Sequence, residues 1–353
     1  MDSPFAFEKV AAGRSIIGRK EQIERMKSIL TESEKGVSIY DTPRSGKEVV
    51  VQEVLSHITS SKKRTIICEM NLFNIRSWKE FFNLMKIKME GCFEEASKGA
   101  LLPFKVDMSE LPAKKIADIP QKLAQDTGTL VIIYIKDFHA ISSFEDSDTM
   151  TAECLDKIWA KHTDVRYILT GSSVGRMKDI FEKRKLFYSS TIHVDLPRID
   201  KILVCNFIVN SFLNIGRVIE NEEALLIYQI TGGNMWYVKQ VCSFCCALPA
   251  GYINHSVVSQ ALEALFSTHS VRFQQIVNDL TFNQLNLLRA INDGVTKFSS
   301  AEILDKYKLN SSANVFRIKE ALEKKDVITF DQSDVPYLLD PLFEYWLKHY
   351  YFI

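Results

Sequence analysis

The chain has 353 residues, 46% of them hydrophobic and 25% charged, which is ordinary globular composition. Because one hydrophobic core rarely exceeds about 250 to 300 residues, we expect two or three domains. Lysine plus arginine equals aspartate plus glutamate, 44 each, which excludes a globally basic nucleic-acid or membrane binder and leaves only local patches. The chain opens without a signal sequence, and no apolar run approaches the ~20 residues that span a bilayer, so we expect a soluble, cytoplasmic protein with no membrane contact.

The first two hundred residues alternate short apolar runs with helical patterns, which is typical of a parallel sheet between helices with right-handed crossovers. The longest run, TLVIIYI, predicts a central strand buried on both faces. Ligands of such sheets bind at the carboxyl ends of the strands, where Gly46, Asp137 and Thr170 fall. The expected strands cover residues 37–40, 65–70, 129–135, 165–169 and 191–196.

After residue 199 the strand signal disappears and helices follow, interrupted at Thr231-Gly232-Gly233. The last 80 residues predict a winged helix, because three short helices precede two short strands, and Ser311-Ser312 is an N-cap signal for the third helix. Phe343, Trp346, Leu347 and Tyr350 form a closing stripe that we expect in the core. The expected winged-helix elements are helices at 281–293, 299–308 and 311–325 and strands at 327–331 and 335–339.

Seven cysteines, an odd number, favour buried free thiols in a reducing compartment over disulfides. Cys242, Cys245 and Cys246 form a C-x-x-C-C cluster. No second Cys/His pair lies at zinc-ligand spacing, and the surrounding sequence predicts a buried helix, so we expect no metal there.

The stretch VSIYDTPRSGKEVVV, residues 37–51, has the strand, turn and helix of a phosphate-binding P-loop. The full pattern is G-x-x-x-x-G-K-[ST], and Gly46 and Lys47 match it. Asp41 stands in place of the first glycine and Glu48 in place of the hydroxyl that ligates Mg²⁺. Taken alone the motif is weak, and a strand, turn and helix with an exposed lysine is an equally good interpretation.

Several further segments decide between these interpretations: IIGRKEQIERM, KDF at the end of the central strand, ILTGSS, LFYSS, TGGNMWYV and YLLDPLFEYWL. Their order resembles the archaeal-type ATPases of the AAA+/STAND class over nearly the whole chain. The resemblance implies a AAA+-like P-loop NTPase domain at 1–198, a helical lid at 199–275 and a winged-helix domain at 276–353. It also implies ATP or ADP as the ligand, and residues near the nucleotide that comprise Ile17, Gly18, Arg19, Pro43, Arg44, Ser45, Gly46, Lys47, Glu48 and Val49.

This chain departs from the family at positions that handle the metal and the reaction. The Mg²⁺-positioning aspartate aligns with Lys136, which leaves Asp137 as the next acidic residue, and Thr170 falls where the family senses the γ-phosphate. Ser189 stands where an arginine is expected, and such an arginine can contribute 10³ to 10⁵ in rate. Asp137 and Thr170 therefore remain doubtful catalytic candidates.

Glu48 and Lys136 suggest a specific exchange. A hydroxyl facing a carboxylate makes a magnesium site, whereas a carboxylate facing an ammonium makes an ion pair. We therefore expect Lys136 to occupy the metal's position and to pair with Glu48, fixing the P-loop without Mg²⁺. Independent drift at a disused site is the alternative, because single ion pairs are weak evidence.

Three functions stay open. The first is a nucleotide-responsive regulator that binds ATP or ADP and hydrolyses it slowly or not at all. The second is a working Mg²⁺-dependent ATPase that uses Asp137 and Glu48, and the third is a nucleotide-free scaffold or DNA-binding protein, which Asp41 favours because its carboxylate would repel phosphate.

The winged helix supplies candidate DNA contacts on its third helix: Asn314, Arg317, Lys319 and Lys324. Glu320 and Glu323 share this helix, so a protein-interaction module is the alternative. Oligomerisation is open as well.

Overall fold

The computed structural model describes residues 3–8, 10–61, 64–98, 111–145 and 150–353. It divides into two compact units. Residues 19–196 form the first, here called the sheet unit, and residues 1–18 with 197–353 form the second, here called the helical unit. Among the described residues, no helix is both long enough and apolar enough to cross a membrane.

The sheet unit is built on five parallel strands in the order β2-β3-β4-β1-β5. The predicted TLVIIYI strand is β3, and its residues 131–135 are buried, as expected for a strand covered on both faces. All residues of β1 and β4 are buried as well. The predicted α/β sheet is therefore confirmed. The strands are β1 (Gly36–Tyr40), β2 (Thr65–Asn71), β3 (Leu130–Lys136), β4 (Val165–Gly171) and β5 (Thr191–His193).

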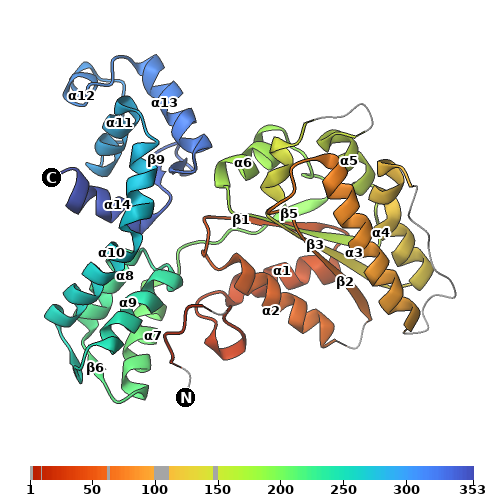
Figure 1. Cartoon of the computed structure of the whole chain (residues 1–353), viewed down its shortest axis with the longest axis horizontal. Coiled ribbons are helices and arrows are strands. Elements are labelled where there is room, and N and C mark those ends of the chain that lie inside the picture. Colours follow the sequence, from red (N-terminus) through yellow and green to blue (C-terminus); the bar gives the residue numbers. More distant parts are fainter. Residues whose placement is uncertain (1–2, 9, 62–63, 99–110, 146–149) are drawn as a thin grey trace. The chain divides into compact units, whose positions relative to one another are not determined.

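Helices cover both faces of this sheet. Figure 1 shows α1 and α2 on one side and α3, α4 and α5 on the other. The predicted stripe that starts at Trp78 is core, since Trp78, Phe81, Phe82 and Met85 are at most 4% exposed. The helices are α1 (Lys20–Glu32), α2 (Lys47–Thr59), α3 (Trp78–Lys98), α4 (Ala113–Thr127), α5 (Ala152–Trp159) and α6 (Val174–Lys178).

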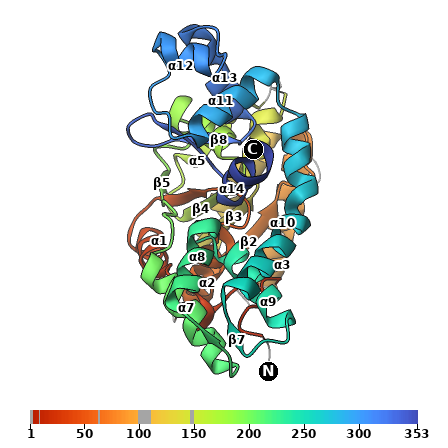
Figure 2. The ribbon, with the colours of Figure 1, turned by 90° about the vertical axis from the view of Figure 1, so that its left-hand side faces the viewer.

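The helical unit begins with four helices, of which α7 packs on α8 and α8 on α9 (Figure 2). They are α7 (Lys201–Asn214), α8 (Asn221–Thr231), α9 (Met235–Ala247) and α10 (His255–Asn278). The start of the chain joins this unit, because Phe5 is fully buried against Phe207 and Phe212 of α7. The sequence instead suggested placing residues 1–18 with the sheet.

Two very short strands, β6 (Val218–Ile219) and β7 (Tyr252–Ile253), pair in parallel within this unit. The sequence indicated no strand between residue 199 and the winged helix, and that prediction was wrong. Two residues are too few to show the period-2 alternation by which a strand is recognised.

The winged helix follows as predicted. The Ser311 hydroxyl accepts the Asn314 N–H, so the expected N-cap is present. The β8–β9 pair is antiparallel, as a wing requires. The elements are α11 (Phe282–Asn292), α12 (Ala301–Lys306), α13 (Ser312–Lys324), β8 (Ile328–Phe330), β9 (Pro336–Leu338) and the closing α14 (Pro341–Trp346).

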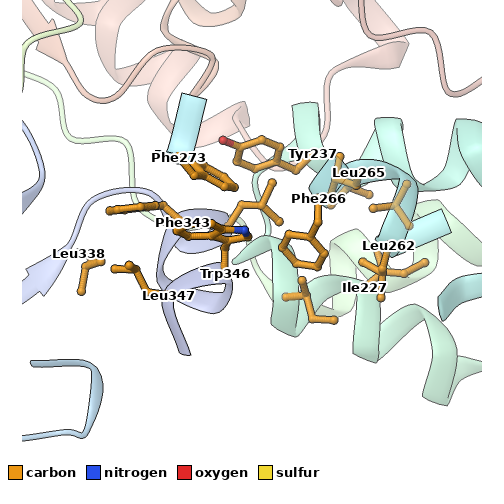
Figure 3. Packing of buried hydrophobic residues seen from close by; sticks show 14 of the residues in the cluster. Ile227, Tyr237, Leu262, Leu265, Phe266, Phe273, Leu338, Phe343, Trp346 and Leu347 are labelled. Carbon is orange, nitrogen blue, oxygen red and sulfur yellow. The ribbon is translucent and has the colours of Figure 1, made fainter. Parts of the chain in front are cut away.

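The winged helix and the helices before it share one hydrophobic core. In Figure 3, Phe343 and Trp346 of α14 lie against Phe273 of α10, with ring centroids 5.3 and 5.6 Å from that of Phe273. The expected domain boundary at 275/276 falls inside the continuous α10.

The glycine break after α8 also belongs to this shared core. Gly232 has φ +60°, and a Cβ there would come within 2.7 Å of Pro341. The TGG segment and the DPLF segment, which are far apart in sequence, therefore touch. Tyr350 departs from the prediction: it is 49% exposed, because the π-helical turn Leu347–Tyr351 shifts it off the face that its spacing indicated.

Candidate nucleotide site

The P-loop connects β1 to α2 at the carboxyl edge of the sheet. Gly46 precedes the helix with φ 98°, a left-handed conformation that glycine adopts without steric cost. No side chain caps the start of α2 among the residues that the structure describes. Because the first N–H groups of a helix lack intrahelical partners and carry its positive dipole, this turn can accept an anion.

Lys47 is held by the loop that it follows. Its ammonium donates to the carbonyl oxygens of Asp41 at 2.8 Å and Thr42 at 2.7 Å, and its side chain is buried. Burial lowers the pKa of Lys47 to about 8, against the opposing charges of Asp41, Asp137 and Glu48. The alternative of an exposed lysine is therefore wrong.

Asp41, at the altered first-glycine position, faces into this loop. Its carboxylate accepts the Thr42 N–H at 2.6 Å. Burial raises the pKa of Asp41, although Lys47 and Arg19 act against the rise. Arg19 is itself buried and donates to the carbonyl oxygen of Ser45 at 3.1 Å, so a second cation braces the loop.

The expected contact between Glu48 and Lys136 is present. The Lys136 ammonium lies 2.6 Å from a carboxylate oxygen of Glu48 and 2.6 Å from one of Glu69. Glu69 is on β2 and Lys136 is at the end of β3, and these strands are neighbours in the sheet. The sequence did not indicate Glu69, because its closeness to Lys136 depends on strand order and register.

Both oxygens of Glu48 are engaged. Oε1 accepts from Lys136 and from Gln52 at 3.1 Å, and Oε2 accepts the Tyr134 hydroxyl at 3.0 Å. Burial would raise the pKa of Glu48, but the hydrogen bond from Lys136 and those from Gln52 and Tyr134 outweigh it and lower the pKa. Lys136 shows the reverse: burial would lower its pKa, and the hydrogen bonds to Glu48 and Glu69 raise it.

This donor set does not fit Mg²⁺. The ion requires near-octahedral oxygen ligands with several waters, and here an ammonium occupies the space between the two carboxylates. Among the described residues, no group of three or more His, Cys, Asp or Glu side chains is placed to hold a metal ion.

Asp137 and Thr170 lie at the carboxyl ends of β3 and β4, which are neighbours in the sheet. Thr170 is buried, and its hydroxyl donates to the Ile135 carbonyl at 3.4 Å. Asp137 follows β3 with φ 54°, a left-handed conformation that aspartate tolerates better than most residues. Its carboxylate lies 4.0 Å from His139. These are the positions that the sequence predicted for catalytic candidates.

The remaining candidate residues divide between the two units. Pro43, Arg44 and Ser45 belong to the P-loop, and Val49 lies half-buried in the first turn of α2. Ile17 and Gly18 belong to the helical unit, where a Cβ at Gly18 would come within 2.3 Å of Ile199. Cys242 and Cys245 lie on α9 and are fully buried in the hydrophobic core of the helical unit.

The candidate DNA-contact residues of α13 differ in whether their side chains contact other parts of the winged helix or are exposed to solvent. Asn314 donates to the Leu309 carbonyl at 3.3 Å, and the Lys319 ammonium lies 4.6 Å from the Phe298 ring centroid. Arg317 and Lys324 are exposed. Phe316, on the same helix, is 63% exposed and was not singled out from the sequence.

The charge of this domain is balanced. Residues 271–349 contain ten lysines and arginines against eleven aspartates and glutamates. Asp331 and Asp334 form the tip of the wing, where the Asp331 carboxylate accepts the N–H groups of Ser333 and Val335. The wing therefore presents carboxylates rather than the cations that bind phosphates.

Comparison with known proteins gives a consistent picture. Residues 271–349 match the family described as "Probable winged helix domain". No curated protein matches the chain. Among solved structures, a Walker-type ATPase of Pyrococcus abyssi superposes with a TM-score of 0.72 at 14% identity, covering 98% of this chain and 99% of that one.

Two further structures come from Aeropyrum pernix. The ORC2 protein in ADPNP and ADP complexes superposes with a TM-score of 0.61 at 14% identity, covering 97% of this chain and 94% of that one. The ORC1 protein in complex with DNA gives a TM-score of 0.50 at 12% identity, covering 99% and 96%. The chain therefore has the fold of the archaeal-type AAA+ ATPases, with a winged helix in its C-terminal part.

Proposed function

We propose that this protein is a AAA+/STAND-like regulator whose P-loop binds ATP or ADP without Mg²⁺ and hydrolyses it weakly or not at all. The observation that carries the proposal is the Lys136 ammonium held 2.6 Å from both Glu48 and Glu69. The two positions that would bind the metal bind each other instead.

The phosphate-binding half of the motif supports nucleotide binding. Lys47, the turn at Gly46 and the start of α2 retain the cation, the left-handed glycine and the N–H donors that hold phosphates. The ammonium of Lys47 is already positioned in the loop, so little side-chain ordering remains to be done when an anion binds. A neighbour in the same fold was solved with ADPNP and ADP, which fits this ligand class.

The active Mg²⁺-dependent ATPase is the second candidate. It requires Glu48 to leave Lys136, Gln52 and Tyr134 in order to ligate the metal, and it leaves Lys136 beside Glu69 next to the ion. Loss of a charge-assisted hydrogen bond in a partly buried site costs about 1.5 to 3 kcal/mol. That cost disfavours the ATPase relative to metal-free binding.

The nucleotide-free scaffold is the third candidate, and Asp41 is its support. Burial raises the pKa of Asp41, and the nearby positive charges of Lys47 and Arg19 offset the charge of its carboxylate. Repulsion of phosphate by Asp41 is therefore weaker than the sequence alone suggests.

For the winged helix we propose DNA or protein binding through the exposed side of α13. Arg317 and Lys324 favour DNA, as does the DNA complex of a neighbour in this fold. Exposed Phe316 and the acidic wing favour protein. Salt-dependent binding to a DNA duplex separates the two partners, because counterion release makes DNA affinity fall steeply with salt.

Calorimetric titration of the purified chain with ATP and ADP, each with Mg²⁺ and with EDTA, tests the proposal. We expect binding of equal affinity in both buffers and no phosphate release. Binding that requires Mg²⁺, with phosphate release that Lys47→Met abolishes, would instead establish the ATPase. Absence of binding for both nucleotides would establish the scaffold.

A further inference from the structure

The charges around the candidate nucleotide site are unevenly distributed. Two groups of residues meet there: the loop of residues 41–47, and Glu48, Glu69 and Lys136, here called the Lys136 cluster. In a P-loop the backbone amides hold the α- and β-phosphates, the lysine reaches the β- and γ-phosphates, and the metal bridges the β- and γ-phosphates. The charge of each group therefore affects how many phosphates the preferred ligand has.

The loop is the more positive of the two groups. The Lys47 ammonium is held by the carbonyl oxygens of Asp41 and Thr42, and Arg19 donates to the carbonyl oxygen of Ser45. Helix α2 begins at the end of the loop and adds its first N–H groups and the positive end of its dipole. The loop therefore suits the α- and β-phosphates.

The Lys136 cluster is negative. The Lys136 ammonium lies 2.6 Å from a carboxylate oxygen of Glu48 and 2.6 Å from one of Glu69. Burial acts against the charges of Lys136 and Glu48, but their hydrogen bonds outweigh it, lowering the pKa of Glu48 and raising that of Lys136. One ammonium between two carboxylates leaves a net charge of −1.

The position of this charge is fixed by further contacts. Glu48 also accepts hydrogen bonds from Gln52 at 3.1 Å and from the Tyr134 hydroxyl at 3.0 Å. Asp137, directly after Lys136, adds another carboxylate at the same edge of the sheet. Burial lowers the pKa of Lys47, and the charge of Asp137 acts against that shift, so Asp137 influences the loop lysine as well.

We propose that this site selects nucleoside diphosphates over nucleoside triphosphates, so that ADP binds more tightly than ATP. The inference rests on the proposed function, because it concerns the same P-loop. A γ-phosphate would approach the position of the metal, where this chain has the Lys136 cluster instead of a dication. The β-phosphate of ADP would remain at the positive loop.

The repulsion of a γ-phosphate should be measurable. The side chains of Lys136 and Glu48 are 22% and 38% exposed, so the cluster is partly shielded from water, and charges interact more strongly there than in bulk solvent. ATP without metal carries one more negative charge than ADP. We therefore expect ADP to bind about tenfold more tightly than ATP when neither nucleotide is complexed with a metal.

Glu69 determines this selectivity. Lys136 paired with Glu48 alone would be neutral, and Glu69 makes the cluster negative. Glu69 lies on β2, outside the P-loop, so its charge can be removed without changing the loop or Lys47. Glutamine at this position keeps the size of the side chain and an oxygen that can accept from Lys136.

Calorimetric titration of the full chain with ADP and with ATP, both in EDTA, tests the selectivity. Glu69→Gln should bring the two affinities to within about threefold, mainly because ATP binds more tightly. Glu94→Gln is the matched control, because Glu94 is exposed on α3 and outside the cluster, and it should leave the ratio as in wild type. Thermal melting of each variant checks that the fold is intact.

The salt dependence tests whether the selectivity is electrostatic. Salt screens charges, so added potassium chloride should bring the two affinities closer together if the γ-phosphate is repelled. If the γ-phosphate were attracted, salt would instead weaken ATP binding more than ADP binding. A ratio that widens with salt, or that salt leaves unchanged, would contradict repulsion by the Lys136 cluster.

The outcomes separate this inference from the proposed function. ATP that binds as tightly as ADP, or more tightly, overturns the diphosphate selectivity and leaves nucleotide binding at the P-loop intact. An unchanged ratio in Glu69→Gln overturns the role of the Lys136 cluster. A chain that binds neither nucleotide overturns the proposed function and this inference together.

Discussion

The edge of the sheet and the third helix of the winged helix were both selected from the sequence for their charged residues, and the structure treats them differently. At the sheet edge, Lys136 and Glu48 contact each other and Lys47 contacts its own loop. On α13, Arg317 and Lys324 point to solvent, and Lys319 lies over Phe298.

The difference shows how to interpret a substituted motif. Where the replaced residues form an ion pair with each other, the site keeps a defined shape and a single arrangement of charge. Removing one partner then leaves the other charge partly buried and unpaired, which is energetically costly. Where candidate residues face water among charges of both signs, each acts independently and contributes little. We therefore expect large, coupled effects at the sheet edge and small, independent effects on α13.

The largest effect should come from Lys47→Met. The carbonyl oxygens of Asp41 and Thr42 hold the Lys47 ammonium in place in the P-loop, so we expect ADP affinity to fall about 100-fold, roughly 2.7 kcal/mol. Calorimetry measures it. Lys35→Met, at the exposed opposite end of β1, is the control and should bind as wild type. Equal ADP affinity for Lys47→Met and wild type would show that the nucleotide does not bind at the P-loop.

A second variant should restore the metal. Glu48→Thr combined with Lys136→Asp returns a hydroxyl and a carboxylate to facing positions, and we expect Mg²⁺ to tighten nucleotide binding at least tenfold, about 1.4 kcal/mol. Titrations with Mg²⁺ and with EDTA measure the change. Glu48→Thr alone leaves Lys136 paired with Glu69 and should show no metal effect. A double variant insensitive to Mg²⁺ would mean that these positions never faced a metal.

The pH dependence should be smaller. The pKa of Lys47 is about 8 in the folded protein and 10.5 in the unfolded chain, because burial disfavours its charge. Phosphate prefers the charged amine, so affinity should fall up to tenfold per pH unit above about pH 8, provided that bound nucleotide retains the proton. Lys47→Met should lose this slope. A flat profile in wild type would place the nucleotide away from Lys47.

The same shift has the opposite sign for stability. Between about pH 8 and 10.5 the unfolded chain binds more protons at Lys47 than the folded one, so the contribution of Lys47 to the free energy of unfolding rises with pH. Urea unfolding at both ends of this window, compared with Lys47→Met, measures the contribution.

The smallest effects belong to α13. If the winged helix binds duplex DNA, Arg317→Ala and Lys324→Ala should each weaken it about threefold and reduce the salt slope by about one, as expected for loss of one phosphate contact. Lys319→Ala should leave the slope unchanged and instead lower stability by about 0.5 to 1 kcal/mol through the lost cation–π contact. Fluorescence anisotropy measures the DNA affinity, and thermal melting measures the stability. An equal loss of DNA affinity for Lys319→Ala would contradict the assignment of Lys319 to packing and of Arg317 and Lys324 to phosphate contacts.

Much of the architecture could be predicted because it depends on local pattern. The apolar runs located all five sheet strands, and the Ser311 cap located the start of α13. The exchange of Glu48 and Lys136 was also predictable, since each stands at a known place in a motif. Glu69 and Tyr134 were not predicted as partners of Lys136 and Glu48, because strand order and register decide which side chains meet. The burial of Phe5 against α7 depends equally on packing between distant segments.

The unbroken α10 and the tight approach of Gly232 to Pro341 bear on how this protein could have been assembled or could be re-engineered. The winged helix cannot be exchanged as a separate domain. Cutting the chain before residue 276 would split α10 and separate Phe273 from the rings of α14 that it packs against. Grafting a foreign winged helix onto this chain would require carrying the second half of α10 along with it and keeping a small residue at position 232.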